Sequence, residues 1–146
     1  MQSQPLVSII LVSFNSEEYI IDCINSLSKQ SYKRFNTILI DNNSSDNSVQ
    51  IVKRDFPKVI TICNDANYGF PKACNIGFKK AFEAKEVKYA ICLNIDTTLD
   101  ENWLKELLEV AENRANIGSI QSKILLHDKP DLINTAANKL TFLGFG

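Results

Sequence analysis

The sequence predicts an α/β fold in which a mostly parallel, doubly wound sheet is flanked by helices. Short runs of β-branched and apolar residues recur along the chain, and each is followed by a polar turn and a segment with helical periodicity. The 146 residues are enough for one domain with its own core. Hydrophobic residues make up 45% and charged residues 23%, as in ordinary globular proteins. We therefore expect a single domain over residues 1–146.

The first half of the chain predicts two strand–helix units. Val7–Val12 is an apolar run without alternation, which is typical of a strand buried on both faces. Asn15 and Glu18 have the spacing of a capping box, which predicts a helix beginning near Ser16. In the second strand–helix unit, Pro57 is expected to end the helix, because proline cannot continue one. The second unit consists of a strand and a helix whose inward face is apolar: Thr37–Ile40, then Val49, Val52 and Phe56.

The second half continues the alternation. Asn67–Pro71 is expected to be a loop between a strand and a helix. The expected elements, in order, are a strand Val59–Cys63, a helix Lys72–Ala84, a strand Tyr89–Leu93, a helix with Trp103, Leu104, Leu107, Leu108 and Ala111 facing inward, and a fifth strand Ser119–Leu126 with a bulge or break. The segment Leu140–Gly146 is apolar and has no solvated tail. We therefore expect this sequence to be a piece of a longer chain.

Charge and cysteine content exclude several classes of protein. The net charge of −1 gives no electrostatic reason to bind nucleic acid. The cysteines, Cys23, Cys63, Cys74 and Cys92, form no CxxC pair, and His127 is the only histidine, so a zinc site is not indicated. We expect reduced, mostly buried thiols in a cytoplasmic protein. No apolar run reaches the length of a membrane span, and the N-terminal residues do not form a signal peptide.

Polar side chains follow each predicted strand, where open α/β sheets bind their ligands. These residues are Ser13–Asn15, Asp41–Asn43, Asn64–Phe70 and Asn94–Thr97. Asp96 leaves a strongly apolar strand and suits a divalent metal such as Mg²⁺ or Mn²⁺, which takes one or two carboxylates together with phosphate oxygens. The alternative is that such loops are polar only because they supply turns and caps, with Asp96 and Thr97 forming one of them.

Five further residues have two interpretations each. Asp41 is an acceptor for a base or ribose group, or the first residue of an Asx-turn. Phe14 stacks on a base or belongs to the core. Lys72 meets a phosphate or is solvated. Gly69 and Gly77 permit close backbone approach or tight packing. The chain lacks the GxGxxG, GxxxxGK[ST] and GxSxG motifs, and Asn94 stands where a DxDxT phosphatase needs its aspartate nucleophile.

Four blocks in this order resemble the family-2 glycosyltransferases, and especially their rhamnosyltransferase-like members. The blocks cover about residues 6 to 110 and are Val7–Asn15, Ile38–Asp46, Asn67–Phe70 with Asn75–Gly77, and Leu93–Asp96 with Trp103 and Leu104. The resemblance implies a GT-A fold, a nucleotide-diphosphate-sugar donor and Asp96 as a metal ligand in the position of the DxD motif. The donor-binding residues that it implies are Val12, Ser13, Phe14, Asn15, Asp41, Asn67, Gly69, Phe70, Lys72, Asn75, Asn94 and Asp96.

The resemblance also implies an inverting transfer, in which a carboxylate base activates the acceptor hydroxyl and Mg²⁺ or Mn²⁺ assists the leaving diphosphate. Two departures matter: Asn94 replaces the first DxD carboxylate, and Cys74 stands where many members have arginine. The resemblance implies that the general base and the acceptor-binding part lie beyond the end of this chain. Neither Asp128 nor Asp131 is expected to be the base, because both are expected in a loop.

The partners that follow are a UDP- or dTDP-linked sugar and a glycan or lipid-linked acceptor in the synthesis of cell-surface polysaccharide. Cytoplasmic localisation is expected, and a peripheral position at the inner membrane face is open for the full-length protein. Two alternatives remain. One is a non-catalytic nucleotide-sugar-binding module or inactive fragment of the same fold. The other is a generic doubly wound protein that binds no nucleotide sugar.

Overall fold

The computed structural model describes residues 4–114 and 116–135, and the chain divides into two compact units, Met1–Lys105 and Glu106–Gly146. The elements of the first unit alternate between strand and helix: β1 Leu6–Ser13, α1 Ile20–Ser28, β2 Phe35–Asp41, α2 Ser48–Asp55, β3 Ile60–Cys63, α3 Phe70–Ala81 and β4 Val87–Asn94. Helix α4 (Trp103–Asn113) contains the boundary between the units, and β5 (Ile124–Leu126) and β6 (Lys129–Thr135) follow it.

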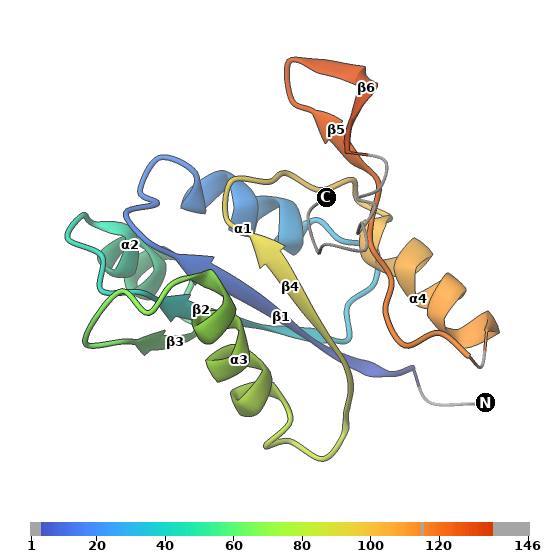
Figure 1. Cartoon of the computed structure of the whole chain (residues 1–146), viewed down its shortest axis with the longest axis horizontal. Coiled ribbons are helices and arrows are strands. Elements are labelled where there is room, and N and C mark those ends of the chain that lie inside the picture. Colours follow the sequence, from blue (N-terminus) through green and yellow to red (C-terminus); the bar gives the residue numbers. More distant parts are fainter. Residues whose placement is uncertain (1–3, 115, 136–146) are drawn as a thin grey trace, which may run out of the picture. The chain divides into compact units, whose positions relative to one another are not determined.

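The first unit is built on a four-stranded sheet with the order β3-β2-β1-β4 (Figure 1). All its neighbouring strands are parallel, and Ser13 of β1 pairs with Asp41 of β2, which pairs with Cys63 of β3. Asn94 of β4 pairs with Val12. The strands therefore end together, and the loops that follow them meet at one edge of the sheet. The expected parallel, doubly wound α/β architecture is confirmed.

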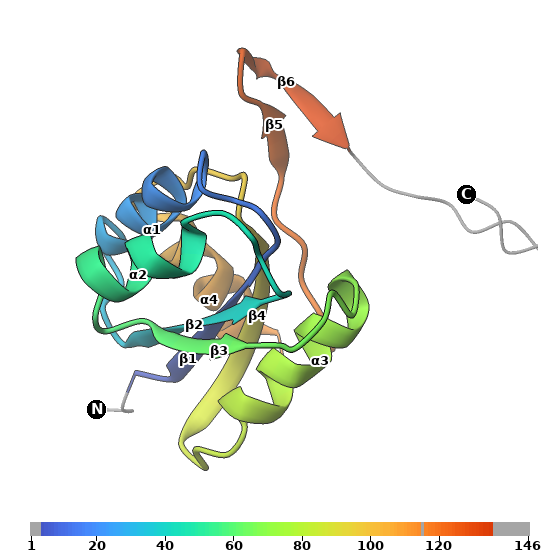
Figure 2. The same ribbon diagram turned by 90° about the vertical axis from the view of Figure 1, so that its left-hand side faces the viewer.

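Helices cover both faces of this sheet, with α3 on one side and α1 and α2 on the other (Figure 2). Under α3, buried side chains of the two central strands meet buried side chains of the helix: Ile10, Val12, Ile38 and Ile40 with Ala73, Cys74 and Ala81. Side chains alternate along a strand, so Ile9 and Leu11 face the opposite side and are also fully buried. The expectation that the first strand is buried on both faces is confirmed.

The helix expected to begin near Ser16 begins instead at Ile20. The amide oxygen of Asn15 does not cap it, because this oxygen accepts a hydrogen bond from the backbone N–H of Ser45, 2.8 Å away. The carbonyl of Ser16 accepts hydrogen bonds from Tyr19 and Ile20, which make a turn before the helix. The capping-box prediction is therefore wrong, because the side-chain oxygen of Asn15 is hydrogen-bonded to Ser45 and not to the first turn of the helix.

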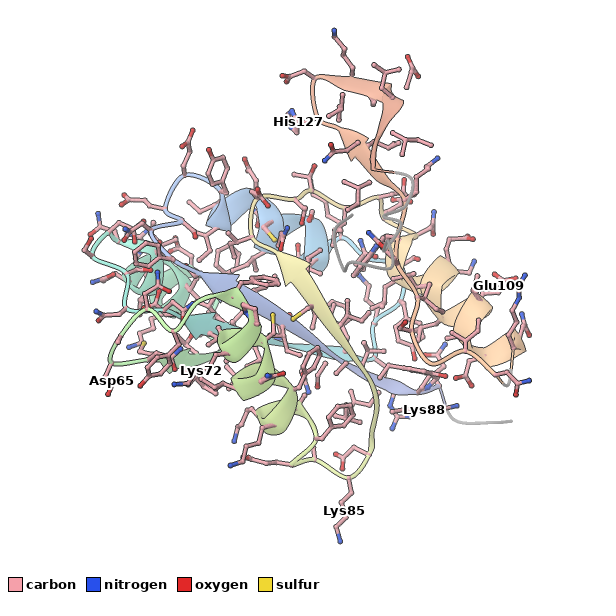
Figure 3. All side chains as sticks on the ribbon, in the orientation of Figure 1. Asp65, Lys72, Lys85, Lys88, Glu109 and His127 are labelled. Carbon is pink, nitrogen blue, oxygen red and sulfur yellow. The ribbon has the colours of Figure 1, made fainter. Side chains whose placement is uncertain are left out.

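The fifth strand is also shorter than expected. Only Ile124–Leu126 of the expected Ser119–Leu126 is a strand, and it pairs antiparallel with β6 in a separate two-stranded sheet. His127 and Asp128 form the turn between these strands (Figure 3). Asp131 lies on β6, which corrects its expected place in a loop. The apolar segment Leu140–Gly146 lies outside the described residues.

The cysteines are free, as expected. Cys23 and Cys74 are buried, Cys92 is half-buried and Cys63 is exposed. Burial raises the pKa of Cys23 and of Cys92 to about 12. Within the described part of the chain, no helix has the length and apolar character needed to cross a bilayer.

Candidate functional site

A pocket of about 430 Å³ lies in the first unit at the carboxyl edge of its sheet. Its volume is within the range of roughly 300 to 1,000 Å³ that is usual for small-molecule sites. Three of the strand-end loops and the residue that follows β2 line it: Val12, Phe14, Asn15, Ser16, Tyr19, Asn42, Asn67, Gly69, Phe70, Asn94, Ile95 and Asp96. The pocket thus occupies the position where ligands bind in open α/β sheets.

The loop after β1 gives the pocket an aromatic and polar wall. Phe14 is 50% exposed, so the interpretation of this ring as a core residue is wrong. Asn15 has a φ of 51°, which is rare for a residue with a side chain. Its backbone N–H donates to the hydroxyl oxygen of Ser44 at 2.9 Å. Tyr19 adds a second ring, 47% exposed, whose pKa is raised by the carboxylate of Glu18 to which its hydroxyl donates.

The loop after β2 contributes Asn42 and not Asp41 to the lining. Asp41 is buried, and its two carboxylate oxygens accept hydrogen bonds from the backbone N–H and the hydroxyl of Ser44. This is a local turn of the kind that the sequence left open. The side chain of Asn42 accepts from Asn64 at 2.8 Å and donates to the carbonyl of Gly69 at 3.4 Å. Asn42 therefore joins the second loop to the third.

The loop after β3 ends at Gly69, which has a φ of 76° and directly precedes the first residue of α3. Its N–H donates to the side-chain oxygen of Asn67 at 2.9 Å. Phe70 follows, 47% exposed in the pocket wall, and Pro71 occupies the first turn of α3, where proline needs no hydrogen-bond partner. The side chain of Lys72 lies at the same end of the helix, outside the pocket lining (Figure 3). Its Nζ is 3.4 Å from the ring centroid of Tyr68.

The loop after β4 carries the pocket's one charged lining side chain, the exposed carboxylate of Asp96. Asn94 is also exposed, and its carbonyl accepts a hydrogen bond from Thr97 at 2.6 Å. Among the described residues no group of three or more histidine, cysteine, aspartate or glutamate side chains is placed to hold a metal ion. One carboxylate with a neighbouring amide fits a Mg²⁺ or Mn²⁺ ion that arrives with phosphate oxygens, and does not fit an all-protein cage.

The pocket brings together eight of the residues predicted for the donor site: Val12, Phe14, Asn15, Asn67, Gly69, Phe70, Asn94 and Asp96. The other four, Ser13, Asp41, Lys72 and Asn75, do not line it. Ser13 is fully buried, and its hydroxyl has no hydrogen-bond partner among the described residues. The sequence reasoning missed Ser16, Tyr19, Asn42 and Ile95. Asn42 and Ile95 belong to segments predicted to follow strands, though not to the twelve predicted donor-binding residues; Ser16 follows Asn15 directly, and Tyr19 lies four residues after Asn15.

Comparison with known proteins decides the family of this chain. The family model described as glycosyl transferase family 2 matches residues 8–129, which includes every loop of the pocket. The chain belongs to glycosyl transferase family 2. Among the curated members, an uncharacterised glycosyltransferase of Haemophilus influenzae is 29% identical over 126 residues, which cover 84% of this chain and 38% of that protein. The poly-β-1,6-N-acetyl-D-glucosamine synthase of Staphylococcus epidermidis is 25% identical, with 87% and 30% covered.

Solved structures support the same family assignment. S. aureus TarS has a TM-score of 0.64 and 28% sequence identity over 73% of this chain and 19% of its own. TarS 1–349 in complex with UDP-GlcNAc has a TM-score of 0.65 over 84% of this chain and 41% of that chain; at 24% identity it shows the fold alone. These likenesses confirm the GT-A fold that the sequence implied. The chain spans less than half the length of each of these family-2 relatives.

Proposed function

We propose that this chain is the donor-binding part of a glycosyltransferase that moves a sugar from a nucleotide-diphosphate-sugar to an acceptor hydroxyl. The pocket at the carboxyl edge of the sheet carries this proposal. It combines exposed aromatic rings, which suit a nucleobase, with amide side chains that can hydrogen-bond sugar or base groups. The TarS structures with UDP and with UDP-GlcNAc support it, since TarS shares this fold.

Charge supports a metal-assisted version of this function. Asp96 is the one charged residue of the lining, so the pocket by itself repels a diphosphate. Bound Mg²⁺ or Mn²⁺ would neutralise the charge on the leaving diphosphate. In the proposal, Asp96 holds the metal and Asn94 assists with its amide oxygen. Mn²⁺ is present in the complex of a Pyrobaculum calidifontis mannosyltransferase with GDP-Man, a structure with a TM-score of 0.57 and 17% identity.

The finer parts of the proposal rest on the resemblance of the motifs. They are the rhamnosyltransferase-like subgroup, a UDP- or dTDP-linked donor, inversion at the anomeric carbon, and a glycan or lipid-linked acceptor held by residues outside this chain. Four predicted donor-binding residues lie outside the lining, and their proposed donor roles rest on this resemblance: Ser13, Asp41, Lys72 and Asn75. The free cysteines support a reducing compartment, the cytoplasm. Two relatives from Staphylococcus epidermidis support a place in cell-surface polymer synthesis: the poly-β-1,6-N-acetyl-D-glucosamine synthase and a teichoic acid poly(glycerol phosphate) polymerase that is 32% identical over 111 residues.

Calorimetric titration tests the donor site. UDP and dTDP are each titrated into the chain with and without Mn²⁺, and the titrations are repeated with Asp96→Asn and with Asp55→Asn. Asp55 is the control because its carboxylate pairs on the surface with Arg54 and lies outside the pocket. We expect Mn²⁺-dependent binding of at least one nucleotide, loss of the Mn²⁺ dependence in Asp96→Asn, and no change in Asp55→Asn.

Two outcomes would contradict the proposal. Failure of the folded chain to bind either nucleotide would refute a complete donor site within these residues. Binding that is equal with and without Mn²⁺ would refute the role of Asp96 as a metal ligand. Transfer assays on the complete protein then separate an active transferase from the non-catalytic module of the same fold.

A further inference from the structure

We propose that Glu17 and Asp46 are positioning residues that hold one wall of the pocket in its binding shape. They belong to the loops after β1 and β2, and neither lines the pocket. We call the set of hydrogen bonds between residues 15–17 and 44–48 the loop clamp. This inference rests on the proposed nucleotide site, since the clamp fixes the wall against which the nucleotide would lie.

The clamp is reciprocal, because each acidic side chain accepts a backbone N–H of the other loop. Asp46 Oδ2 accepts the N–H of Glu17 at 2.8 Å. Glu17 Oε2 accepts the N–H of Asn47 at 3.0 Å, and the side-chain amide of Asn47 donates to both oxygens of Glu17 at 3.1 Å. Hydrogen bonds to ionised acceptors are the stronger kind. Together these bonds fix the two loops against each other at two adjacent points.

Serine hydroxyls extend the clamp toward the pocket. The N–H of Ser16 donates to Ser48 Oγ at 2.9 Å, and Ser48 Oγ in turn donates to Asp46 Oδ1 at 2.5 Å. The pKa of Asp46 is lowered: burial raises it, but the hydrogen bonds from Ser48 and from the N–H of Glu17 outweigh the burial. The charged form of Asp46 is therefore the form that the clamp favours.

The wall that the clamp holds has an unfavourable backbone. Asn15 adopts a φ of 51°, in the left-handed region that residues with a side chain seldom occupy. Phe14, Asn15 and Ser16 line the pocket, while the residues that hold them from the second loop, Ser44 to Asn47, do not. Without the clamp, the first loop can relax into other conformations. A nucleotide then binds only the fraction that keeps the competent wall, and its apparent affinity falls by that fraction.

A matched pair of variants tests this inference through UDP affinity, measured by calorimetry in Mn²⁺. Glu17→Ala removes both acceptor oxygens and should weaken UDP binding on the order of tenfold. Glu17→Gln should restore most of the affinity, because the glutamine amide oxygen can accept the backbone N–H of Asn47. The side-chain amide of Asn47 can rotate by 180° so that its oxygen accepts from the glutamine amide. Glu86→Ala, an exposed glutamate outside the pocket, is the control and should bind like the unchanged chain.

Amide hydrogen exchange without nucleotide tests the clamp independently of the proposed function. Glu17→Ala should speed exchange at Asn47, which loses its acceptor, and also at Asn15 and Ser16 in the pocket wall. Faster exchange at Asn47 alone, with Asn15 and Ser16 unchanged, would overturn the inference. So would equal UDP affinity of Glu17→Ala and the unchanged chain. If the unchanged chain binds neither UDP nor dTDP, the proposed function fails, and the exchange result decides the clamp by itself.

Discussion

Gly77 lies directly against Ile10, and a β-carbon added at Gly77 would sit 2.4 Å from Cγ2 of that isoleucine. Gly77 belongs to α3 and Ile10 to the buried central strand β1. The contact sets how closely α3 approaches the sheet, and both the Asn67–Phe70 loop and the first turn of α3 are held at the pocket by that approach. A glycine in the middle of a helix lowers helix stability. The close contact with Ile10 explains why glycine occupies this position of α3.

The first prediction concerns this contact. Gly77→Ala should lower the free energy of unfolding by about 1–2 kcal/mol, because a β-carbon 2.4 Å from Ile10 overpacks the core at the upper end of the usual cost, about 2–3 kcal/mol, and alanine regains about 1 kcal/mol of helix propensity. Urea denaturation measures the difference. The control is Gly118→Ala, since a β-carbon at Gly118 meets nothing within 4 Å. Gly118→Ala should change stability by less than about 0.5 kcal/mol. Equal effects of the two substitutions would show that α3 can shift away from the sheet.

A second prediction concerns Gln30, a fully buried polar side chain at the end of α1. Its Oε1 accepts the N–H of Leu104 at 2.9 Å, and its Nε2 donates to the carbonyl of Asp100 at 2.6 Å. Gln30→Met keeps the shape but leaves both backbone groups without this partner, which should cost about 2–4 kcal/mol of unfolding free energy. Urea denaturation measures it, with the exposed neighbour Lys29→Met as the control. A loss below about 0.5 kcal/mol would mean that water replaces both hydrogen bonds.

The parallel fold could be predicted from the sequence because each of its strands is a short apolar run with its own polar turn. The capping side chain of Asn15 could not be assigned in this way. Its partner, Ser45, lies thirty residues away, and only the pairing of β1 with β2 brings the two together. The strand predicted over Ser119–Leu126 is longer than the observed one for a related reason. Its apolar residues fit a strand of the parallel sheet as well as the short antiparallel pair that forms.

The candidate site was predictable to the level of its loops and less so to single side chains. The strand-end rule found Phe14, Asn15 and Asp96, which project into the pocket from loops whose place the sheet fixes. Asp41 also follows a strand, yet its carboxylate is turned to Ser44. Hydrogen-bond partners three residues away compete with a ligand for such a side chain, and only the coordinates show which partner is used.

The third prediction concerns the order in which the cysteines react. Cys63 is exposed, whereas Cys74 is buried and burial raises the pKa of Cys23 and of Cys92 to about 12. At pH 8 only about one in ten thousand thiols with such a pKa is a reactive thiolate. Labelling with an aromatic disulfide at pH 8 should therefore show one fast thiol in the folded chain and four in urea. The fast phase should vanish in Cys63→Ser; its survival in that variant would show that a buried thiol is accessible.

The last prediction concerns the aromatic wall of the pocket. Phe14 is 50% exposed in the lining, so its removal takes little from the core, while stacking of a base on an aromatic ring is worth about 1–3 kcal/mol. Phe14→Ala should therefore weaken UDP binding by about tenfold or more and leave the urea midpoint nearly unchanged. The matched control is Phe82→Ala, because Phe82 is 55% exposed and lies outside the pocket. Equal UDP affinity of the two variants would show that the base does not stack on Phe14, and Phe70→Ala and Tyr19→Ala would then test the other two rings.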